Sequence, residues 1–178
     1  MKKTFKLVLI TVGTIALIYG LTYKTEMQSF AFACSLLILL MVGVRSFTET
    51  LKSPLTSSYF KQKPWERRGK IYELLGINFY RKLLVWIGWE KVSQKTKPVK
   101  KNTKTLIHLY HETKHDELGH LIILIIVIGF NIFVAFKFGV LNSLWLFVLN
   151  ILTNLYPVLL QRYNRPRIER AINLSIHR

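Results

Sequence analysis

Histidines and carboxylates gather in residues 108–120, where the sequence reads HLYHETKHDELGH at the start of a long apolar run. A helix would place Glu112, Glu117 and His120 on one face of this segment. Carboxylates three or four residues from an imidazole can hold its tautomer and increase its basicity, as a general base requires. The segment therefore predicts an acid–base site, although a charged turn that merely ends a membrane span has the same composition.

Two short patterns overlap in this segment. His111-Glu112-x-x-His115 matches the H-E-x-x-H pattern of zinc proteases, in which two histidines one turn apart bind the metal and the glutamate acts on its water. His108 is available there as a third ligand. The spacing from His111 to Asp116 matches the H-x4-D pattern of glycerolipid acyltransferases. Both patterns arise readily by chance in a stretch rich in His and Glu, so zinc at His111 and His115 stays an alternative.

Uncharged polar residues recur along the last apolar run of the chain. They share one helical stripe, which consists of Asn150, Thr153, Asn154 and Gln161. Such groups in hydrocarbon face a neighbouring helix or a polar cavity rather than lipid. The stripe therefore predicts either hydrogen bonds between helices or the wall of a polar cavity.

The stripe leads into a dense basic block, which reads Gln161-Arg162-Tyr163-Asn164-Arg165-Pro166-Arg167. We interpret this block as a rigid turn where the span leaves the membrane, because proline fixes the backbone between two of its arginines. Guanidinium groups bind phosphate and carboxylate bidentately, so Arg162, Arg165 and Arg167 are candidate ligands for an anionic group. A flank that only anchors the span to lipid is the alternative.

The elements that must position these residues follow from the composition of the chain. Of its 178 residues, 51% are hydrophobic, and 26 Lys and Arg oppose only 9 Asp and Glu, which gives a net charge of +17. So apolar and basic a chain excludes most soluble enzymes and any disordered tail. It leaves a small membrane protein or a basic protein that binds nucleic acid.

Four segments are apolar enough to span or nearly span a bilayer, which takes about 20 residues of helix. They are Leu7–Tyr23, Ser29–Val44, Leu118–Phe138 and Val140–Leu160. If these form two hairpins, every Lys and Arg except Lys24 and Lys137 lies on the side of both termini. The positive-inside rule places that side in the cytoplasm. We therefore expect an all-α integral membrane protein with four transmembrane helices and both termini inside.

Nucleic acid is not expected as a partner. The basic residues flank the membrane and show neither zinc-finger spacing nor an RNA-binding aromatic motif. Attraction to anionic lipid headgroups accounts for most of these charges. The apolar run after Lys2, Lys3 and Lys6 lacks a cleavage pattern, so we interpret it as an uncleaved anchor.

We expect a single membrane domain over residues 1–178. It consists of a first hairpin (1–45), a basic cytoplasmic and interfacial segment (46–104), a second hairpin (105–160) and a basic tail (161–178). Within the basic segment, Ser46–Lys63 is expected to be an extended connector. Residues Ile71–Val92 mix apolar residues and charges with Trp86 and Trp89, which favours an amphipathic element at the membrane interface. A helix should then begin near residues 103–105 and continue into the third span.

The chain also resembles a known family. Glu112-Thr113-Lys114-x-x-Glu117-x-x-His120, a span, and then Asn154 with the block from Gln161 to Arg167 resemble the glycosyl-4,4'-diaponeurosporenoate acyltransferases. A looser match lies upstream, at Glu66-x-x-Gly69-Lys70. Members of that family are small bacterial membrane proteins associated with the last step of staphyloxanthin-type carotenoid synthesis. The resemblance covers about residues 60–170.

The resemblance implies an enzyme that esterifies a hydroxyl of a glycosylated lipid with a fatty acyl chain at the cytoplasmic face of the bacterial cytoplasmic membrane. The acyl donor would be acyl-CoA or an acyl carrier protein, and the acyl thioester would be a co-substrate, with no cofactor required. The family pattern requires no histidine at His111 or His115. This favours Glu112, Glu117 and His120 as the catalytic residues over the zinc and H-x4-D interpretations.

We therefore expect direct acyl transfer, with His120 as the general base, oriented by Glu117 or Glu112, and with three arginines on the phosphates of the donor. Asn154 or Gln161 would donate to the developing oxyanion. The expected substrate-binding residues are Asn154, Gln161, Arg162, Tyr163, Asn164, Arg165 and Arg167. Two alternatives stay open. One is a membrane zinc hydrolase that uses His111, Glu112 and His115, and the other is a non-enzymatic membrane interaction protein.

Overall fold

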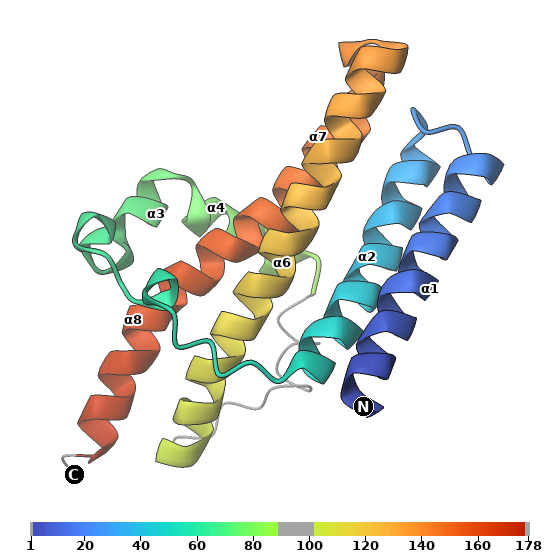
Figure 1. The fold of residues 1–178 in the computed structure, drawn as a ribbon. Coiled ribbons are helices and arrows are strands. Elements are labelled where there is room, and N and C mark those ends of the chain that lie inside the picture. Colours follow the sequence, from blue (N-terminus) through green and yellow to red (C-terminus); the bar gives the residue numbers. More distant parts are fainter. Residues whose placement is uncertain (1, 89–101, 177–178) are drawn as a thin grey trace. The chain divides into compact units, whose positions relative to one another are not determined.

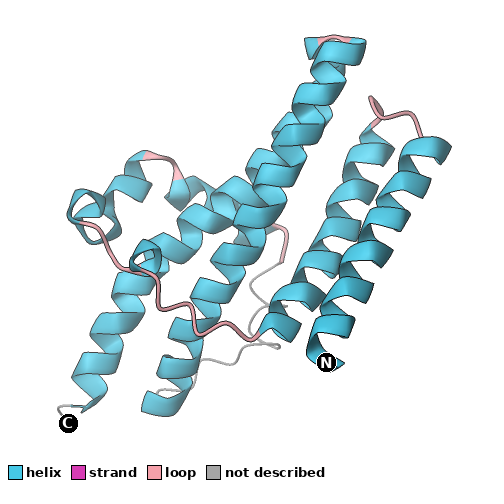
Figure 2. Ribbon diagram, viewed as in Figure 1, coloured by secondary structure: helices cyan, strands magenta, loops and turns pink. Residues whose placement is uncertain are grey.

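The computed structural model describes residues 2–88 and 102–176, and all regular structure in these residues is helical (Figures 1 and 2). Four helical stretches among them are long and apolar enough to cross a membrane. They are α1 (Lys2–Lys24), α2 (Phe30–Leu51), α6 (Thr103–Phe138) and the stretch Val140–Ile176. The predicted all-α fold with four spans is confirmed, and α6 begins within the predicted range.

The chain forms two compact units, and α6 contributes residues to both. The first unit comprises Met1–Pro54 and Leu118–Leu155. The second comprises Leu55–Glu117 and Tyr156–Arg178.

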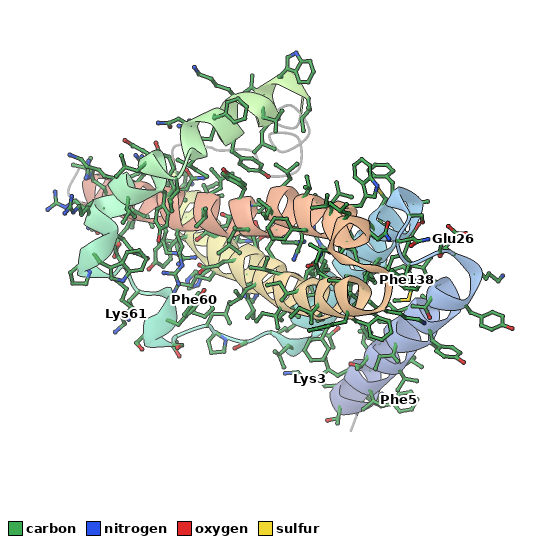
Figure 3. The ribbon with its side chains drawn as sticks, turned by 90° about the horizontal axis from the view of Figure 1, so that it is seen from above. Lys3, Phe5, Glu26, Phe60, Lys61 and Phe138 are labelled. Carbon is green, nitrogen blue, oxygen red and sulfur yellow. The ribbon has the colours of Figure 1, made fainter. Side chains whose placement is uncertain are left out.

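The first unit contains α1 and α2 as an antiparallel pair of neighbouring helices (Figure 1). The side chain of Ser29 caps α2 by accepting a hydrogen bond from the backbone N–H of Phe32 at 3.1 Å. A Cβ on Gly43 would lie only 2.5 Å from the Thr14 hydroxyl oxygen, so the missing side chain lets the two helices approach closely. At the start of α1, Lys3 donates to the carbonyl of Leu51 at 2.8 Å, whereas Phe5 is exposed (Figure 3).

The apolar core of the first unit is built around α2. Its buried members on α2 are Phe32, Ala33, Leu36, Leu37, Leu40 and Val44. Ile123, Val127 and Val134 of α6 join them, together with Leu146 of α7 (Leu144–Asn150). The turn between the last two spans starts at Gly139, whose φ of +96° is in a region that favours glycine. After it come η3 (Val140–Ser143), α7 and a π-helical segment η4 (Ile151–Leu155).

The second unit packs short helices against α8 (Tyr156–Ile176). The short helices are η1 (Ser58–Phe60), η2 (Pro64–Gly69), α3 (Lys70–Leu74) and α4 (Ile77–Trp86). Tyr72, Ile77, Tyr80 and Tyr163 form its buried apolar cluster. Tyr80 of α4 stacks on Tyr156 of α8 with ring centroids 4.9 Å apart.

Three local features differ from the sequence-based expectations. The helix α2 continues through Leu51, so the expected connector starts later than predicted. The expected amphipathic element is two short helices separated at Gly76, which has a φ of +80°, and its residues after Gly88 lie outside the described range. The block from Gln161 to Arg167 belongs to α8, which contains Pro166, so the prediction of a turn there is wrong.

The helix α8 continues through Pro166 although proline removes one backbone hydrogen bond of the helical ladder. The lost bond would have ended at the carbonyl of Arg162, four residues earlier. Side chains on both sides of Pro166 are fixed by contacts within the second unit, through Arg162 and Arg165 before it and Arg167 after it. These contacts hold the helical path that the sequence pattern alone does not favour.

Candidate active site

Two arginines of α8 and two glutamates form a buried ion-pair cluster in the second unit. Arg162 donates from Nε to Glu117 Oε1 at 2.7 Å and from Nη1 to Glu66 Oε1 at 2.6 Å. Arg165 donates from Nη2 to the second oxygen, Oε2, of Glu117. Glu117 is 0% exposed and Glu66 is 3% exposed. The four charges cancel, as buried charges must if their desolvation is to be offset.

The same arginines also bind backbone carbonyls of the second unit. Arg165 donates to the carbonyls of Phe60 at 3.1 Å and Thr113 at 3.2 Å, and to the Thr113 hydroxyl at 3.3 Å. Arg162 donates to the carbonyl of Tyr59 at 3.1 Å and lies over its ring, 4.4 Å from the centroid. The guanidinium groups therefore hold η1 against the start of α6 and against α8.

Glu66 was missing from the predicted site residues, although it is the only acid in the basic stretch from Lys61 to Tyr72. Its carboxylate accepts from the Lys63 backbone N–H at 3.0 Å and from the Tyr72 hydroxyl at 2.8 Å. Burial opposes ionisation of Glu66, but these hydrogen bonds and the contact with Arg162 outweigh it, so the pKa of Glu66 is lowered. Burial and the hydrogen bond to Glu66 raise the pKa of Tyr72. Glu66 is therefore held as a carboxylate.

Arg167, Tyr163 and Gln161 of the basic block also have side-chain partners within the second unit. Arg167 pairs with Glu73 at 3.0 Å in a half-exposed ion pair, and its guanidinium carbon lies 3.5 Å from the ring centroid of the buried Tyr163. Gln161 donates to Asp116 at 3.5 Å, and Asn164 is half-buried. The three arginines expected on donor phosphates thus each pair with a carboxylate of the chain.

In the first unit, His120 contacts the polar stripe predicted on the last span. The Nδ1 atom of His120 lies 3.3 Å from Oδ1 of Asn154, which is fully buried. Asn154 donates from Nδ2 to Asn150 Oδ1 at 2.9 Å and to the Thr153 hydroxyl at 3.2 Å. Asn150 in turn donates from Nδ2 to the backbone carbonyl of Leu124 at 3.1 Å.

This chain of hydrogen bonds has one consistent direction. A backbone carbonyl can only accept, so the Leu124 carbonyl fixes which end of the Asn150 amide faces it. The Asn150 oxygen is then left to accept from the Asn154 nitrogen, and the Asn154 oxygen faces His120. An amide oxygen also only accepts, so Nδ1 of His120 carries the proton. Neutral His120 consequently has its lone pair on Nε2, as a general base needs.

The backbone around Asn154 is itself unusual. Asn154 lies in the π-helical segment η4, and such segments are rare and frequently occur at functional sites. Pro157 follows closely and has no N–H to offer the Thr153 carbonyl, so one hydrogen bond of the regular α-helical ladder is missing at this turn. Across this segment the side chains of Asn150 and Asn154 bond directly to each other.

Comparison with known proteins shows which family the chain belongs to. The model of the glycosyl-4,4'-diaponeurosporenoate acyltransferase (CrtO) family matches residues 56–174. The chain belongs to this family. The match confirms the resemblance predicted from the sequence, and it spans every predicted site residue from Glu112 to Arg167 as well as Glu66. No curated protein and no solved structure matches the chain.

Three more histidines of this acyltransferase family member lie on the first half of α6, and His177 lies outside the described residues. His108 and His111 are exposed, His115 is half-buried, and Glu112 is half-buried beside them in the sequence. Among residues 2–88 and 102–176, no group of three His, Cys, Asp or Glu side chains comes together in a way that could hold a metal ion.

Proposed function

We propose that this chain is a membrane acyltransferase that esterifies a hydroxyl of a glycosylated, carotenoid-type lipid with a fatty acyl chain at the cytoplasmic face. The observation that carries the proposal is the family match over residues 56–174, since the family is that of the glycosyl-4,4'-diaponeurosporenoate acyltransferases. Four membrane-spanning helices suit an acceptor and an acyl chain that both partition into lipid. The donor is an acyl thioester of CoA or of an acyl carrier protein.

His120 is the proposed general base. Its Nε2 takes the proton of the sugar hydroxyl while the oxygen attacks the carbonyl carbon of the thioester. The bond from that carbon to sulfur then breaks, and the imidazolium returns the proton to the leaving thiolate. The products are an ester and a free thiol, and the enzyme is regenerated without a covalent acyl intermediate.

The hydrogen-bond directions support a new role for Asn154. Both of its N–H donors are directed at Asn150 and Thr153, so we assign Asn154 to hold the tautomer of His120 rather than to stabilise the oxyanion. We propose that Glu117 positions Arg162 and Arg165, because both of its carboxylate oxygens accept hydrogen bonds from these arginines. Glu112 stays a predicted site residue without an assigned step.

The experiment is an acylation assay on the purified protein in lipid nanodiscs, with glycosyl-4,4'-diaponeurosporenoate as acceptor and palmitoyl-CoA as donor. Mass spectrometry should show an acceptor heavier by one palmitoyl group, and a thiol reagent should detect one CoA released for each ester formed. Release of CoA without an acylated acceptor would show a thioester hydrolase and contradict the proposal. The same assay with palmitoyl-loaded acyl carrier protein identifies the preferred donor.

A further inference from the structure

A basic turn at the end of η2, together with the first residue of α3, presents cations that the ion-pair cluster does not use. Arg67, Arg68 and Lys70 are all exposed. Within the parts of the chain that the structure describes, their side chains form no hydrogen bond or ion pair, whereas Arg162, Arg165 and Arg167 all do. The exposed cations of this turn are therefore available to an external anion, whereas Arg162, Arg165 and Arg167 on α8 are already paired with carboxylates.

The backbone of this turn is left-handed over three consecutive residues. The φ and ψ angles are 46° and 47° at Arg67 and 56° and 34° at Arg68, and φ is 89° at Gly69. Residues with a Cβ rarely adopt this conformation, and it persists only where the surroundings enforce it. Such strained backbone is concentrated at binding and catalytic sites.

Contacts on both sides enforce the turn. Before it, the carboxylate of Glu66 is fixed by its hydrogen bonds to Lys63, Tyr72 and Arg162. After it, Gly69 packs so closely on α8 that a Cβ would lie 3.2 Å from the Tyr163 carbonyl. The two exposed arginines are therefore carried on a backbone of fixed shape.

The contact with Tyr163 also fixes how far along α8 the turn lies from the end of the apolar run. The apolar run of the last span ends at Leu160, and the polar block begins at Gln161. At a rise of about 1.5 Å per residue, Tyr163 lies roughly 5 Å beyond the end of that run. The headgroup layer on each side of the hydrocarbon core is about 5–8 Å thick, so a span along the bilayer normal would place the turn at the level of the lipid phosphates.

The neighbouring surface of the second unit has the composition of a membrane interface. Trp65 next to the turn is 57% exposed, and Phe79 and Trp86 on α4 are 73% and 84% exposed. Phe79 and Trp86 are seven residues apart and so share one face of α4, whose opposite face carries the buried Ile77 and Tyr80. Exposed aromatic rings next to cations are typical of surfaces that lie among lipid headgroups.

We propose that Arg67 and Arg68, with Lys70, form a binding site for the phosphate of anionic phospholipids. Guanidinium groups bind phosphate oxygens bidentately, and the anionic leaflet concentrates the ligand at this depth. The site does not depend on the acyl-transfer chemistry. It differs from a general attraction of basic residues to the membrane, because it consists of three defined residues on one strained turn.

The test uses Trp65 as a local reporter. Trp86, Trp89 and Trp145 are replaced by Phe, so that Trp65 is the remaining tryptophan. The protein is reconstituted in phosphatidylcholine vesicles that contain 20% phosphatidylglycerol. In one sample the phosphatidylglycerol has brominated acyl chains, and in the other an equal amount of phosphatidylcholine has them. At equal content of brominated lipid, phosphatidylglycerol should quench Trp65 at least twice as strongly as phosphatidylcholine. The Arg67→Asn/Arg68→Asn variant should lose this difference, because asparagine tolerates the left-handed backbone but carries no charge.

The matched control is Lys52→Asn/Lys61→Asn. It also removes two exposed cations, one of them, Lys52, in the left-handed conformation with a φ of 47°, and Lys61 is labelled in Figure 3. This control should keep the preference for phosphatidylglycerol. Equal quenching by the two lipids around the unchanged turn would overturn the proposal. A preference for phosphatidylglycerol that survives in the double arginine variant would also overturn the proposal. So would a preference that added CoA abolishes, since CoA would then be the occupant of the site.

Discussion

The amide of Asn154 orients a histidine without bringing a charge into an apolar unit. A carboxylate in that place would have to be desolvated, whereas a buried amide needs only its hydrogen-bond partners. Asn150 and Thr153 occupy both N–H donors of Asn154, so its oxygen is directed at His120. The Asn154 amide therefore favours the tautomer of His120 that carries the proton on Nδ1.

Replacing Asn154 by leucine should lower kcat by roughly tenfold or more, because His120 loses the acceptor that keeps the proton on Nδ1. The KM values for donor and acceptor should change little, since the amide is buried away from solvent. Steady-state kinetics in nanodiscs measure both constants. Asn154→Asp is the control, as it keeps an acceptor oxygen and should retain more of kcat. Wild-type kcat in the leucine variant would contradict the assigned tautomer.

The ion pair of Arg165 is buried and that of Arg167 is half-exposed, so the same substitution at the two positions compares their contributions to stability. Arg165→Met leaves the carboxylate of Glu117 short of a partner in a buried place and should destabilise the protein by about 3–5 kcal/mol. Arg167→Met breaks a half-exposed pair with Glu73 and should cost under about 1 kcal/mol. Denaturant unfolding in detergent measures both. Similar losses in the two variants would contradict the structural role given to Arg165.

Among the elements, η2 depends on the ionised state of one side chain. Glu66 joins η2 to α3 through Tyr72 and to α8 through Arg162, and both contacts require its carboxylate as an acceptor. Because the folded state lowers the pKa of Glu66 below its usual value of 4.5, folding favours the ionised form. This contribution to stability is complete above about pH 4.5 and is lost as the pH falls through the lower value in the folded state.

Acidification should therefore distinguish the wild-type protein from Glu66→Gln. The glutamine variant should unfold at a lower temperature at neutral pH, where the wild type has the ionised contacts. Below about pH 4.5 the difference in Tm should shrink, because only the wild type loses a contribution that the variant never had. Thermal unfolding in detergent at a series of pH values measures this difference. A constant difference down to pH 2 would show that Glu66 does not titrate in the folded protein.

The elements themselves could largely be predicted from hydrophobic length, since apolar runs mark the spans and α6 begins where expected. The continuation of α8 through Pro166 could not, because it depends on partners such as Glu117 and Glu73 that lie far away in the sequence. The site residues could likewise be predicted from the sequence but their partners could not, because those partners also lie far away in the sequence. Sequence spacing suggested that Glu117 orients His120, which stays a prediction. Spacing gave no sign of Arg162 and Arg165, which the tertiary fold brings to the oxygens of Glu117.

For the whole molecule, the orientation in the membrane is a prediction from charge. With two hairpins, every Lys and Arg except Lys24 and Lys137 lies on the side of the termini, and such residues are retained in the cytoplasm. Reporter fusions after Ser53 and at the C-terminus should both report the cytoplasm, and a fusion near Met27 should report the exterior. An external signal at either of the first two positions would contradict the proposed orientation.

The central claim is that His120 is the base of an acyl transfer to a glycosylated lipid, and the initial rate of His120→Gln in the nanodisc assay tests it most directly. Glutamine can form a hydrogen bond but cannot accept the proton, so the rate of ester formation should fall by about 10²–10⁴. Unchanged expression and Tm would show that the fold is intact. A rate near that of the wild type would contradict the account, because His120 would then have no part in the chemistry.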